Sequence, residues 1–296
     1  MSSLFSKSIT LRRELKITDE EFKQLRDFIY DQSGIYVADN RKYLLENRLG
    51  NRVRELNLKD FGEYYYFLRY DPGKRQELSK LFEVVTTNET SFFRNPPQLK
   101  VFQEQVLAEV IAQQRKKGDK RLNIWSAGCS TGEEPYTIAM LLETVKKSHP
   151  GIDFKYFVLG TDISRRVIEK ARTAIYSTYQ IQHIPMEIKH QSLLKSRDSS
   201  KGLFKVAPEV REHVRFRQLN FLDADFQLRD HFDIIFFRNV QIYFQPDDRK
   251  SIVSKILSYL KNGGYIIFGY AENITDLEMD LEHLDKCIFR KNQYGK

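Results

Sequence analysis

The fold is decided by the stretch Asn123-Ile124-Trp125-Ser126-Ala127-Gly128-Cys129-Ser130-Thr131-Gly132-Glu133-Glu134-Pro135-Tyr136. The apolar run 122–125 is typical of a buried strand, and a loop rich in glycine and serine follows it. Apolar residues then recur at helical spacing, so the stretch predicts a strand, a loop and a helix in succession. The loop glycines, Gly128 among them, let a ligand approach the backbone closely.

The ligand expected in this loop is nucleotide-like and positively charged. The loop contains neither G-x-G-x-x-G nor G-K-[ST], so it matches no phosphate-binding motif. Two carboxylates, Glu133 and Glu134, open the helix, where they repel a pyrophosphate and attract a cation. S-adenosylmethionine (SAM) carries a sulfonium and therefore fits this loop better than a dinucleotide does.

The composition is that of a globular protein. Its 296 residues suffice for one large domain or two smaller ones, and no run is long enough for a membrane helix or a signal peptide. Cys129 and Cys287 lie far apart and predict reduced thiols in a cytoplasmic protein, and the scattered histidines predict no metal site. The net charge of +8 leaves three classes of acidic partner open: nucleic acid, an anionic membrane surface or an acidic protein surface.

The first third of the chain is predicted to be helical. A capping box at Thr18–Glu21 starts a helix that Gly34 ends. Further helices are expected over about 39–56, 60–70 and 75–85. We therefore expect a helical N-terminal domain over 1–85 and a linker over 86–97 that contributes to the active site.

The SAM-binding domain is expected over 98–296: a helix opens at Pro96-Pro97, and from Leu122 onward strands alternate with helices, which predicts a doubly wound α/β sheet. The expected strands are Leu122–Trp125, Tyr156–Leu159, Val214–Leu219, Phe232–Phe237, Tyr265–Phe268 and Cys287–Phe289. Between about 174 and 211 the alternation breaks for longer than a simple connection requires. We expect an inserted small subdomain there, made of a helix and a hairpin with Gly202 near the turn.

Polar residues follow two of these strands at the end where ligands bind in such sheets. Asp162 comes after the second strand, where an acid accepts hydrogen bonds from ribose hydroxyls. Arg238, Asn239 and Tyr243 come after the buried strand 232–237 and can reach a ligand. The pattern leaves a second interpretation open, in which Arg238 extends into solvent and Tyr243 belongs to the core.

Taken together, these stretches resemble the CheR-type chemotaxis receptor methyltransferases. The matching segments occur in the family's order and are Thr86-Thr87-Asn88-x-Thr90-x-Phe92-Phe93-Arg94, Trp125 to Tyr136, Gly160-Thr161-Asp162-Ile163, Leu219-Asn220, Arg238-Asn239-Val240-x-Ile242-Tyr243-Phe244 and Lys261-x-Gly263-Gly264. They cover most of the chain from about Leu15 to Arg290, and the run through Cys129 is highly specific.

The resemblance implies a Rossmann-like SAM-dependent methyltransferase domain with an all-helical N-terminal domain and an inserted β-subdomain. It implies SAM as methyl donor, S-adenosylhomocysteine as product and glutamate side chains of chemoreceptors as acceptors, giving methyl esters. The implied partner is the cytoplasmic helical domain of the receptor, and we expect a cytoplasmic monomer that neither binds nucleic acid nor inserts into a membrane.

The resemblance also implies the site residues. Positions expected at the cofactor are Asn88, Thr90, Arg94, Gly128, Glu133, Asp162, Asn220, Phe221, Arg238 and Asn239. Within this set Glu133 is expected at the methionine part and Asp162 at the ribose. Arg94 and Tyr243 are the expected catalytic residues, with Tyr243 close to the transferred methyl. A receptor glutamate is ionised at pH 7, because its reference pKa is about 4.3, so the reaction needs no general base.

A basic helix offers a docking surface for an acidic receptor. Between Arg41 and Arg54 there are five basic residues and one acid, and Arg41, Arg48 and Arg52 fall on one line of a helical wheel. Electrostatic docking to an acidic helical bundle is one interpretation, and a merely solvated helix face is the other. The insertion at 174–211 is the competing docking site.

Two rival functions are weighed against receptor methylation. A nucleic-acid methyltransferase agrees with the positive charge, and Asn95-Pro96-Pro97-Gln98 is similar to an amino-methylase motif, but Gln98 supplies no ring to stack on a flipped base. A regulatory module that binds SAM without transferring methyl is the other rival. The presence of Arg94, Glu133, Asp162, Arg238 and Tyr243 argues against it.

Overall fold

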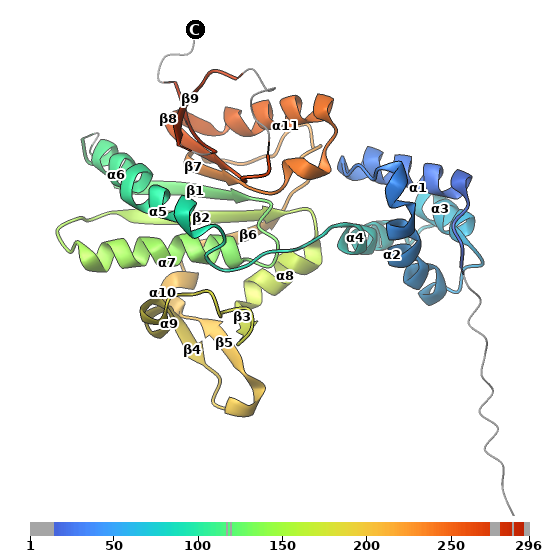
Figure 1. Cartoon of the computed structure of the whole chain (residues 1–296), viewed down its shortest axis with the longest axis horizontal. Helices are drawn as coiled ribbons and strands as arrows, with labels where there is room; N and C mark the ends of the chain where they lie inside the picture. Colours follow the sequence, from blue (N-terminus) through green and yellow to red (C-terminus); the bar gives the residue numbers. More distant parts are fainter. Residues whose placement is uncertain (1–14, 117, 119, 273–278, 286, 293–296) are drawn as a thin grey trace, which may run out of the picture. The chain divides into compact units, whose positions relative to one another are not determined.

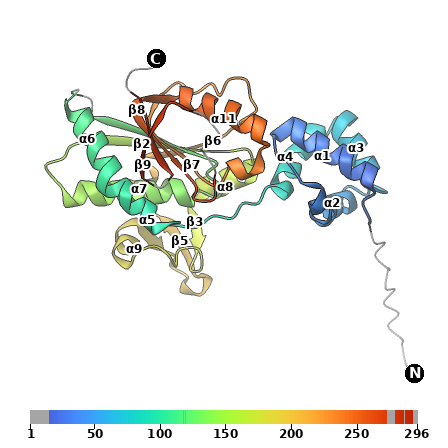
Figure 2. The same ribbon diagram turned by 45° about the horizontal axis from the view of Figure 1, so that its top comes forward.

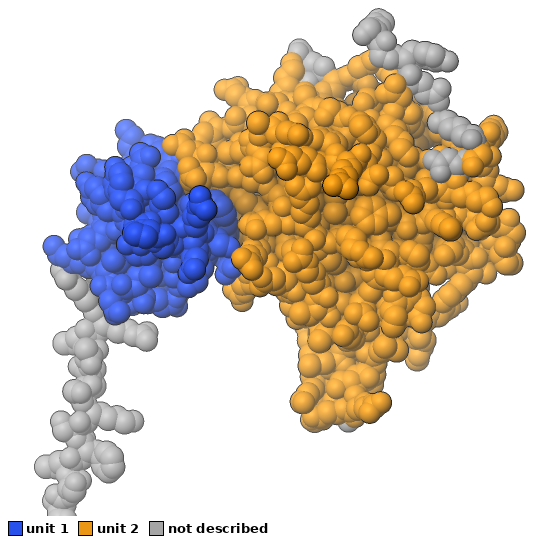
Figure 3. Space-filling view, turned by 180° about the vertical axis from the view of Figure 1, so that it is seen from behind, with its two compact units in different colours: residues 1–28, 37–85 blue, residues 29–36, 86–296 orange. Residues whose placement is uncertain are grey.

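The protein is described by a computed structural model over residues 15–116, 118, 120–272, 279–285 and 287–292. The chain divides into two compact units (Figure 3). Unit 1 contains residues up to Phe28 and Val37–Val85, and unit 2 contains Ile29–Tyr36 and the chain from Thr86 onward. The division differs from the predicted domains in one segment, because 29–36 groups with unit 2.

Unit 1 is built from helices whose starts are encoded locally. Its helices are α1 (Asp19–Ser33), a 3₁₀ turn (Asp39–Arg41), α2 (Lys42–Glu55), α3 (Phe61–Tyr70) and α4 (Lys74–Val85), and the last residues of α1 group with unit 2. The predicted capping box forms, since the Thr18 amide donates to the Glu21 carboxylate at 2.8 Å and the Glu21 amide donates to Thr18 Oγ1 at 3.2 Å. Asp60 caps α3 through the Glu63 amide at 2.9 Å.

The apolar stripe of α2 forms the core of unit 1. Leu45, Leu49 and Val53 are at most 1% exposed and pack in a core with Phe61 and Leu81. The other helices contribute the remaining buried side chains, so each helix is stabilised by tertiary burial of one face.

Unit 2 is centred on a seven-stranded sheet in the order β6-β2-β1-β7-β8-β10-β9 (Figures 1 and 2). Its strands are β1 (Arg121–Ala127), β2 (Lys155–Asp162), β6 (Val214–Gln218), β7 (Phe232–Phe237), β8 (Leu260–Phe268), β9 (Leu281–Asp285) and β10 (Ile288–Lys291). The first five pair in parallel, and β10 is antiparallel to both β8 and β9. Chain order reverses beside β1, and ligands bind at such a point, beyond the carboxyl ends of the strands.

Helices cover both faces of this sheet, as the doubly wound fold predicted from sequence requires. These helices are α5 (Pro96–Val101), α6 (Leu107–Lys116), α7 (Glu133–Ser148), α8 (Arg165–Thr173) and α11 (Pro246–Ser258), with a π-helical turn (Phe102–Val106) joining α5 to α6. Alternate strand residues enter opposite cores: Ile124 packs with the α6 and α7 side, and Trp125 packs with the α11 side. Both cores are therefore fixed by the alternation of the buried strands.

A second, three-stranded sheet forms the expected insertion and protrudes from unit 2 (Figure 3). It consists of β3 (Ile175–Ser177), β5 (Leu203–Val206) and β4 (Leu193–Lys195), accompanied by α9 (Met186–Ser192) and α10 (Pro208–Arg211). Gly202, with φ of +55°, lies directly before β5, close to the turn predicted there. The fold class predicted from the sequence is confirmed, including this subdomain.

Each of the six predicted strands forms, and β9 is the strand of the large sheet that the sequence did not indicate. Its residues Leu281-Glu-His-Leu-Asp285 are mostly exposed and lie at the edge of the sheet, beside an irregularity in the pairing with β10. An edge strand with this composition has no apolar run to reveal it.

In the described ranges, no helix has both the length and the apolar character needed to cross a membrane. In the same ranges, no three His, Cys, Asp or Glu side chains are grouped so as to hold a metal ion.

Candidate cofactor and active site

The glycine loop after β1 passes close to two other segments of unit 2. Gly128 has φ of +88°, and a Cβ placed on it would lie 2.3 Å from Val240 Cγ2. Gly132 has φ of +95°, and its Cβ would lie 2.8 Å from Ala171 Cβ. Both positions need glycine because of their backbone conformation and because Val240 and Ala171 occupy the space that a Cβ would take.

Asp162 joins this loop to the end of β2. Its side chain accepts hydrogen bonds from the backbone amides of Ser130 at 3.0 Å and Ser164 at 2.9 Å, and the residue is 8% exposed. Burial raises the pKa of Asp162, and the backbone amides oppose this rise. The carboxylate thus lies beside the glycine loop, and its predicted role toward a ribose stays a prediction.

The two carboxylates at the start of α7 have different surroundings. Glu133 is 2% exposed and accepts hydrogen bonds from Thr131 Oγ1 at 2.7 Å and Gln180 Nε2 at 3.2 Å. Burial raises the pKa of Glu133, while these two donors act in the opposite direction. Gln180 comes from the inserted subdomain, and no sequence signal connected it to the site.

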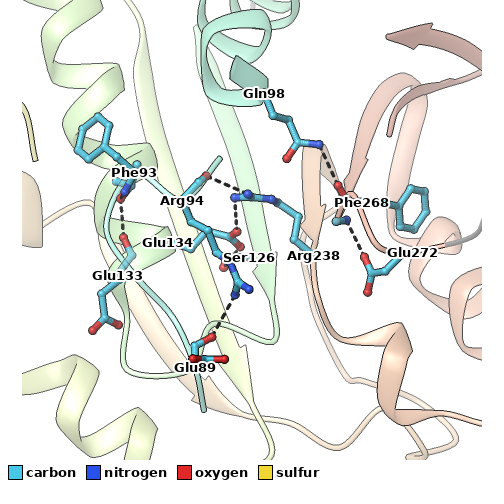
Figure 4. A network of polar contacts seen from close by, with 12 residues as sticks. Glu89, Phe93, Arg94, Gln98, Ser126, Glu133, Glu134, Arg238, Phe268 and Glu272 are labelled. Carbon is cyan, nitrogen blue, oxygen red and sulfur yellow. Dashed lines mark hydrogen bonds and ion pairs between the residues drawn. The ribbon is translucent and has the colours of Figure 1, made fainter. Parts of the chain in front are cut away.

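Glu134 is already neutralised within the protein. It accepts a hydrogen bond from Ser126 Oγ at 2.8 Å and forms an ion pair with Arg238 Nη1 at 3.0 Å (Figure 4). The prediction that both carboxylates attract a cationic ligand is therefore wrong for Glu134, because Arg238 supplies the cation. Glu133 forms no ion pair among the described residues, and its role toward the ligand stays a prediction.

Arg238 is buried and joins the linker to Glu134 at the start of α7. Its side chain is 3% exposed, and besides the Glu134 pair its Nη2 donates to the backbone carbonyl of Arg94 at 2.9 Å (Figure 4). The alternative in which Arg238 extends into solvent is wrong, because the guanidinium finds both partners inside unit 2. Arg238 fastens the linker segment to the carboxyl end of the sheet.

The linker 86–97 is anchored at further points. Phe92 is fully buried and packs edge-to-face on Tyr176 with ring centroids 4.8 Å apart, and the Phe93 amide donates to Thr137 Oγ1 at 3.1 Å. Ser130 Oγ donates to the Asn88 carbonyl at 3.2 Å, which joins the linker to the glycine loop. The linker therefore lies against the site within unit 2.

Tyr243 lies at the end of the loop that follows β7. The residue ends a 3₁₀ turn, Gln241–Tyr243, and its hydroxyl donates to the Thr87 carbonyl at 2.9 Å. It is half-buried and so not a core residue, which removes the second interpretation of Tyr243. Asn239 has a positive φ of 61°, so the chain turns sharply between Arg238 and Tyr243.

The segment 29–36 was missed by the sequence analysis. Within unit 2, the Tyr36 amide donates to the Tyr243 carbonyl at 2.8 Å, and Asn220 Nδ2 donates to the Gln32 carbonyl at 2.8 Å. Two residues expected at the site are thus held by this segment. Each contact ends on a backbone carbonyl, which no residue pattern reveals.

Unit 2 contains every residue predicted at the cofactor or the reaction centre. They come from the linker, the loops after β1, β6 and β7, the first residue of α7 and the last residue of β2, and they are Asn88, Thr90, Arg94, Gly128, Glu133, Asp162, Asn220, Phe221, Arg238, Asn239 and Tyr243. Segments far apart in sequence therefore meet at one end of one sheet. Their individual roles toward SAM remain predictions.

The predicted docking stripe does not form one exposed surface on unit 1. Arg52 is 8% exposed and binds Glu77 through Nε at 2.8 Å and Nη2 at 2.6 Å, and Arg48 donates to the Val85 carbonyl. Arg41 alone of the three is exposed. The prediction that all three arginines dock a receptor is wrong, because a helical wheel does not show that the face carrying Arg52 is covered by α4.

The two domains described above match two protein families. Residues 88–288 match the CheR methyltransferase SAM binding domain, and residues 20–86 match the CheR methyltransferase all-alpha domain. The chain belongs to the CheR methyltransferase family. It is therefore a SAM-dependent methyltransferase, and the glycine loop with Glu133 and Asp162 belongs to its SAM binding domain.

Curated relatives agree with this family assignment over most of their length. The chain is 34% identical to a chemotaxis protein methyltransferase of Borreliella burgdorferi, over 94% of this chain and 96% of the relative. It is 33% identical to chemotaxis protein methyltransferase 2 of Pseudomonas aeruginosa, over 89% and 90%, and 32% identical to the Escherichia coli protein, over 91% and 90%.

A solved structure, that of the glycopeptide N-methyltransferase MtfA complexed with sinefungin, is similar to this chain at a TM-score of 0.31 and 13% identity. The likeness covers 65% of this chain and 59% of that one. The CheR-family assignment does not rest on this similarity.

Proposed function

We propose that this CheR-family enzyme transfers the methyl group of SAM to glutamate side chains in the cytoplasmic helical domain of chemoreceptors. The family membership and the names of the relatives support a role in chemotaxis. The observation that carries the proposal is the position of the linker, which Arg238 and Tyr243 hold at the site so that Arg94 is available to an acidic acceptor.

The proposed reaction is a direct displacement. An acceptor carboxylate oxygen attacks the methyl carbon, the carbon–sulfur bond breaks, and S-adenosylhomocysteine leaves as a neutral thioether. A receptor glutamate is ionised at neutral pH, with a reference pKa of about 4.3, so no base must remove a proton. The contribution of the protein is to hold the carboxylate and the methyl group in line.

Arg94 is suited to orienting the carboxylate. Among the described residues its side chain donates only to the Glu89 carbonyl, at 3.1 Å, so further guanidinium N–H groups can bind an acceptor. The backbone of Arg94 is fixed by Arg238. The Arg94 guanidinium can therefore align the acceptor carboxylate without forming a permanent ion pair that would weaken it as a nucleophile.

We propose that receptor docking involves either the exposed basic end of α2 at Arg41 or the inserted subdomain. Arg41→Glu reverses one exposed charge without touching the Arg52–Glu77 pair, so reduced methylation of receptor with unchanged SAM affinity supports docking at α2. Normal methylation by this variant, together with loss on deletion of 196–202, assigns docking to the insertion.

The decisive experiment is transfer from methyl-labelled SAM to purified receptor cytoplasmic domains. We expect base-labile label that maps to glutamates and disappears when these are replaced by alanine. Asp162→Ala provides the control with impaired cofactor binding. Label that enters nucleic acid instead of receptor, or no transfer to any receptor while SAM binds normally, would falsify the proposal.

A further inference from the structure

Glu272 is a buried carboxylate that none of the assignments above uses. It ends a turn after β8, in which its amide donates to the Gly269 carbonyl at 3.1 Å, and it is 7% exposed. Among the described residues no lysine or arginine forms an ion pair with it. Burying a carboxylate without a cation destabilises the fold unless hydrogen bonds satisfy it. The donors that bind Glu272 therefore show which segments it holds.

Those partners are backbone amides from two different turns. One oxygen, Oε2, accepts from the Gly269 amide at 2.6 Å within its own turn (Figure 4). The other, Oε1, accepts from the amides of Val240 and Gln241, both at 2.8 Å, in the loop after β7. Burial raises the pKa of Glu272, and the backbone amides oppose that rise.

The two turns also touch directly. A Cβ on Gly269 would lie 2.9 Å from the backbone nitrogen of Asn239, from its Nδ2 and from Glu272 Oε2. The positive φ of Asn239 exposes the next two amides in succession, and successive amides form an anion-binding concavity. Glu272 fills that concavity with a charge belonging to the protein itself.

The loop held in this way carries residues of the site. Arg238 and Asn239 precede the two amides, and Tyr243 follows them by two residues at the end of the 3₁₀ turn. Gln241 contributes its amide to Glu272, and its own buried side chain has no hydrogen-bond partner among the described residues. At Val240 and Gln241, Glu272 therefore supplies the hydrogen bonds that hold this part of the loop.

We propose that Glu272 is a positioning residue for methyl transfer: its carboxylate fixes the loop 239–243 and thereby sets the place of Asn239 and Tyr243 at the reaction centre. This inference rests on the proposed function for the acceptor, since turnover is measured on receptor. The effect of Glu272 on the loop does not depend on the receptor, because the hydrogen bonds are made within the enzyme.

The test compares Glu272→Gln with Asp233→Asn as a control for loss of a buried carboxylate. Asp233 is 5% exposed and accepts from the Asn123 amide at 2.8 Å at the other end of β7, and unlike Glu272 it also forms an ion pair with Lys261 at 2.8 Å. Glu272→Gln preserves size and one acceptor oxygen but places an NH₂ group against a backbone N–H. Gly269→Ala is the second variant, because its Cβ would press on both Asn239 and Glu272 Oε2 while the carboxylate itself is retained.

We expect kcat on receptor to fall about 10–100-fold in Glu272→Gln and Gly269→Ala, because a displacement of about 1 Å costs this much in an aligned transfer. In Asp233→Asn, kcat should change by less than about twofold, even if this variant loses as much stability as Glu272→Gln does. Hydrogen exchange of the peptide covering 239–243 should accelerate in the first two variants and not in the control.

Three outcomes overturn the proposal. One is wild-type kcat and KM in Glu272→Gln; another is unchanged exchange over 239–243. The third is a loss of activity in Asp233→Asn that is as large as the loss in Glu272→Gln when the two variants are equally destabilised. If the wild-type enzyme methylates no receptor, the proposed acceptor is wrong, and the exchange result still decides whether Glu272 holds the loop.

Discussion

Replacing Arg52 with methionine tests whether this arginine belongs to the core of unit 1 or to a docking surface. The guanidinium makes two hydrogen bonds to Glu77, at 2.8 and 2.6 Å, and a further ion pair with Glu55. Tyr64 adds its hydroxyl to Glu77 at 2.8 Å. Arg52→Met leaves a Glu77 side chain that is 4% exposed without its cation.

The size of the effect follows from that burial. Removing one partner of a buried ion pair costs about 3–5 kcal/mol, because an uncompensated charge remains in the interior. For a domain of about 60–100 residues, each kcal/mol lowers the midpoint of thermal unfolding by about 4–8 °C. We therefore expect the midpoint of unit 1 to fall by at least about 12 °C. Arg41→Met, at an exposed position, should change the stability by less than about 0.5 kcal/mol.

The assay can follow the two units separately in the full chain. The single tryptophan, Trp125, lies in unit 2, so its fluorescence reports unfolding of that unit, whereas far-ultraviolet circular dichroism reports helices of both. In Arg52→Met we expect helical signal to be lost at a lower temperature than the change in Trp125 fluorescence. The double variant Arg52→Met/Glu77→Leu should recover most of the stability, because no unpaired charge remains.

The reasoning fails if Arg52→Met unfolds at the same temperature as Arg41→Met. It also fails if the double variant is no more stable than the single one. Either result means that Arg52 is solvated and that Glu77 does not depend on it, and the arginine then returns to consideration as a receptor contact.

Three further predictions concern the cofactor site. Asp162→Ala should weaken SAM binding by about 1.5–3 kcal/mol, the range for a hydrogen bond to a charged group, and calorimetry on ligand-free protein measures it. Arg94→Ala should reduce kcat more than SAM affinity, and a loss confined to affinity contradicts its role toward the acceptor. Burial raises the pKa of Asp162, so its contribution to folding is complete below its unfolded pKa of about 3.8 and is lost as the pH rises through the folded value. The difference in stability between the wild type and Asp162→Ala in urea unfolding should therefore shift in favour of the variant as the pH rises above about 4, and a constant difference contradicts this.

Much of the fold was predictable because its signals are local. The capping box of α1, the Asp60 cap of α3 and the apolar runs of the parallel strands depend on residues within a few positions of each other. The edge strand β9 was missed because an exposed edge needs no apolar run. The site residues predicted at strand ends meet in space, since parallel strands place their carboxyl ends together.

The pairing of charges could not be read from the sequence. Glu134 and Arg238 are 104 residues apart, and either could have faced a ligand until the fold brought them to 3.0 Å. Arg52 lies on the same line of the helical wheel as Arg41 but is covered by α4, whose Glu77 neutralises it. A helical wheel gives the direction of a side chain and not what lies opposite it.

The sequence by itself determined the helical character of unit 1, the parallel strands of the large sheet and the glycine loop, because each depends on local spacing or on residue types required at one place. Only the tertiary structure decided which of the two carboxylates pairs with Arg238, that segment 29–36 contacts Tyr243 and Asn220, and that Glu272 accepts from the loop after β7. The physical reason is that backbone amides and buried charges obtain partners by proximity, and proximity across the chain is created only when the cores pack.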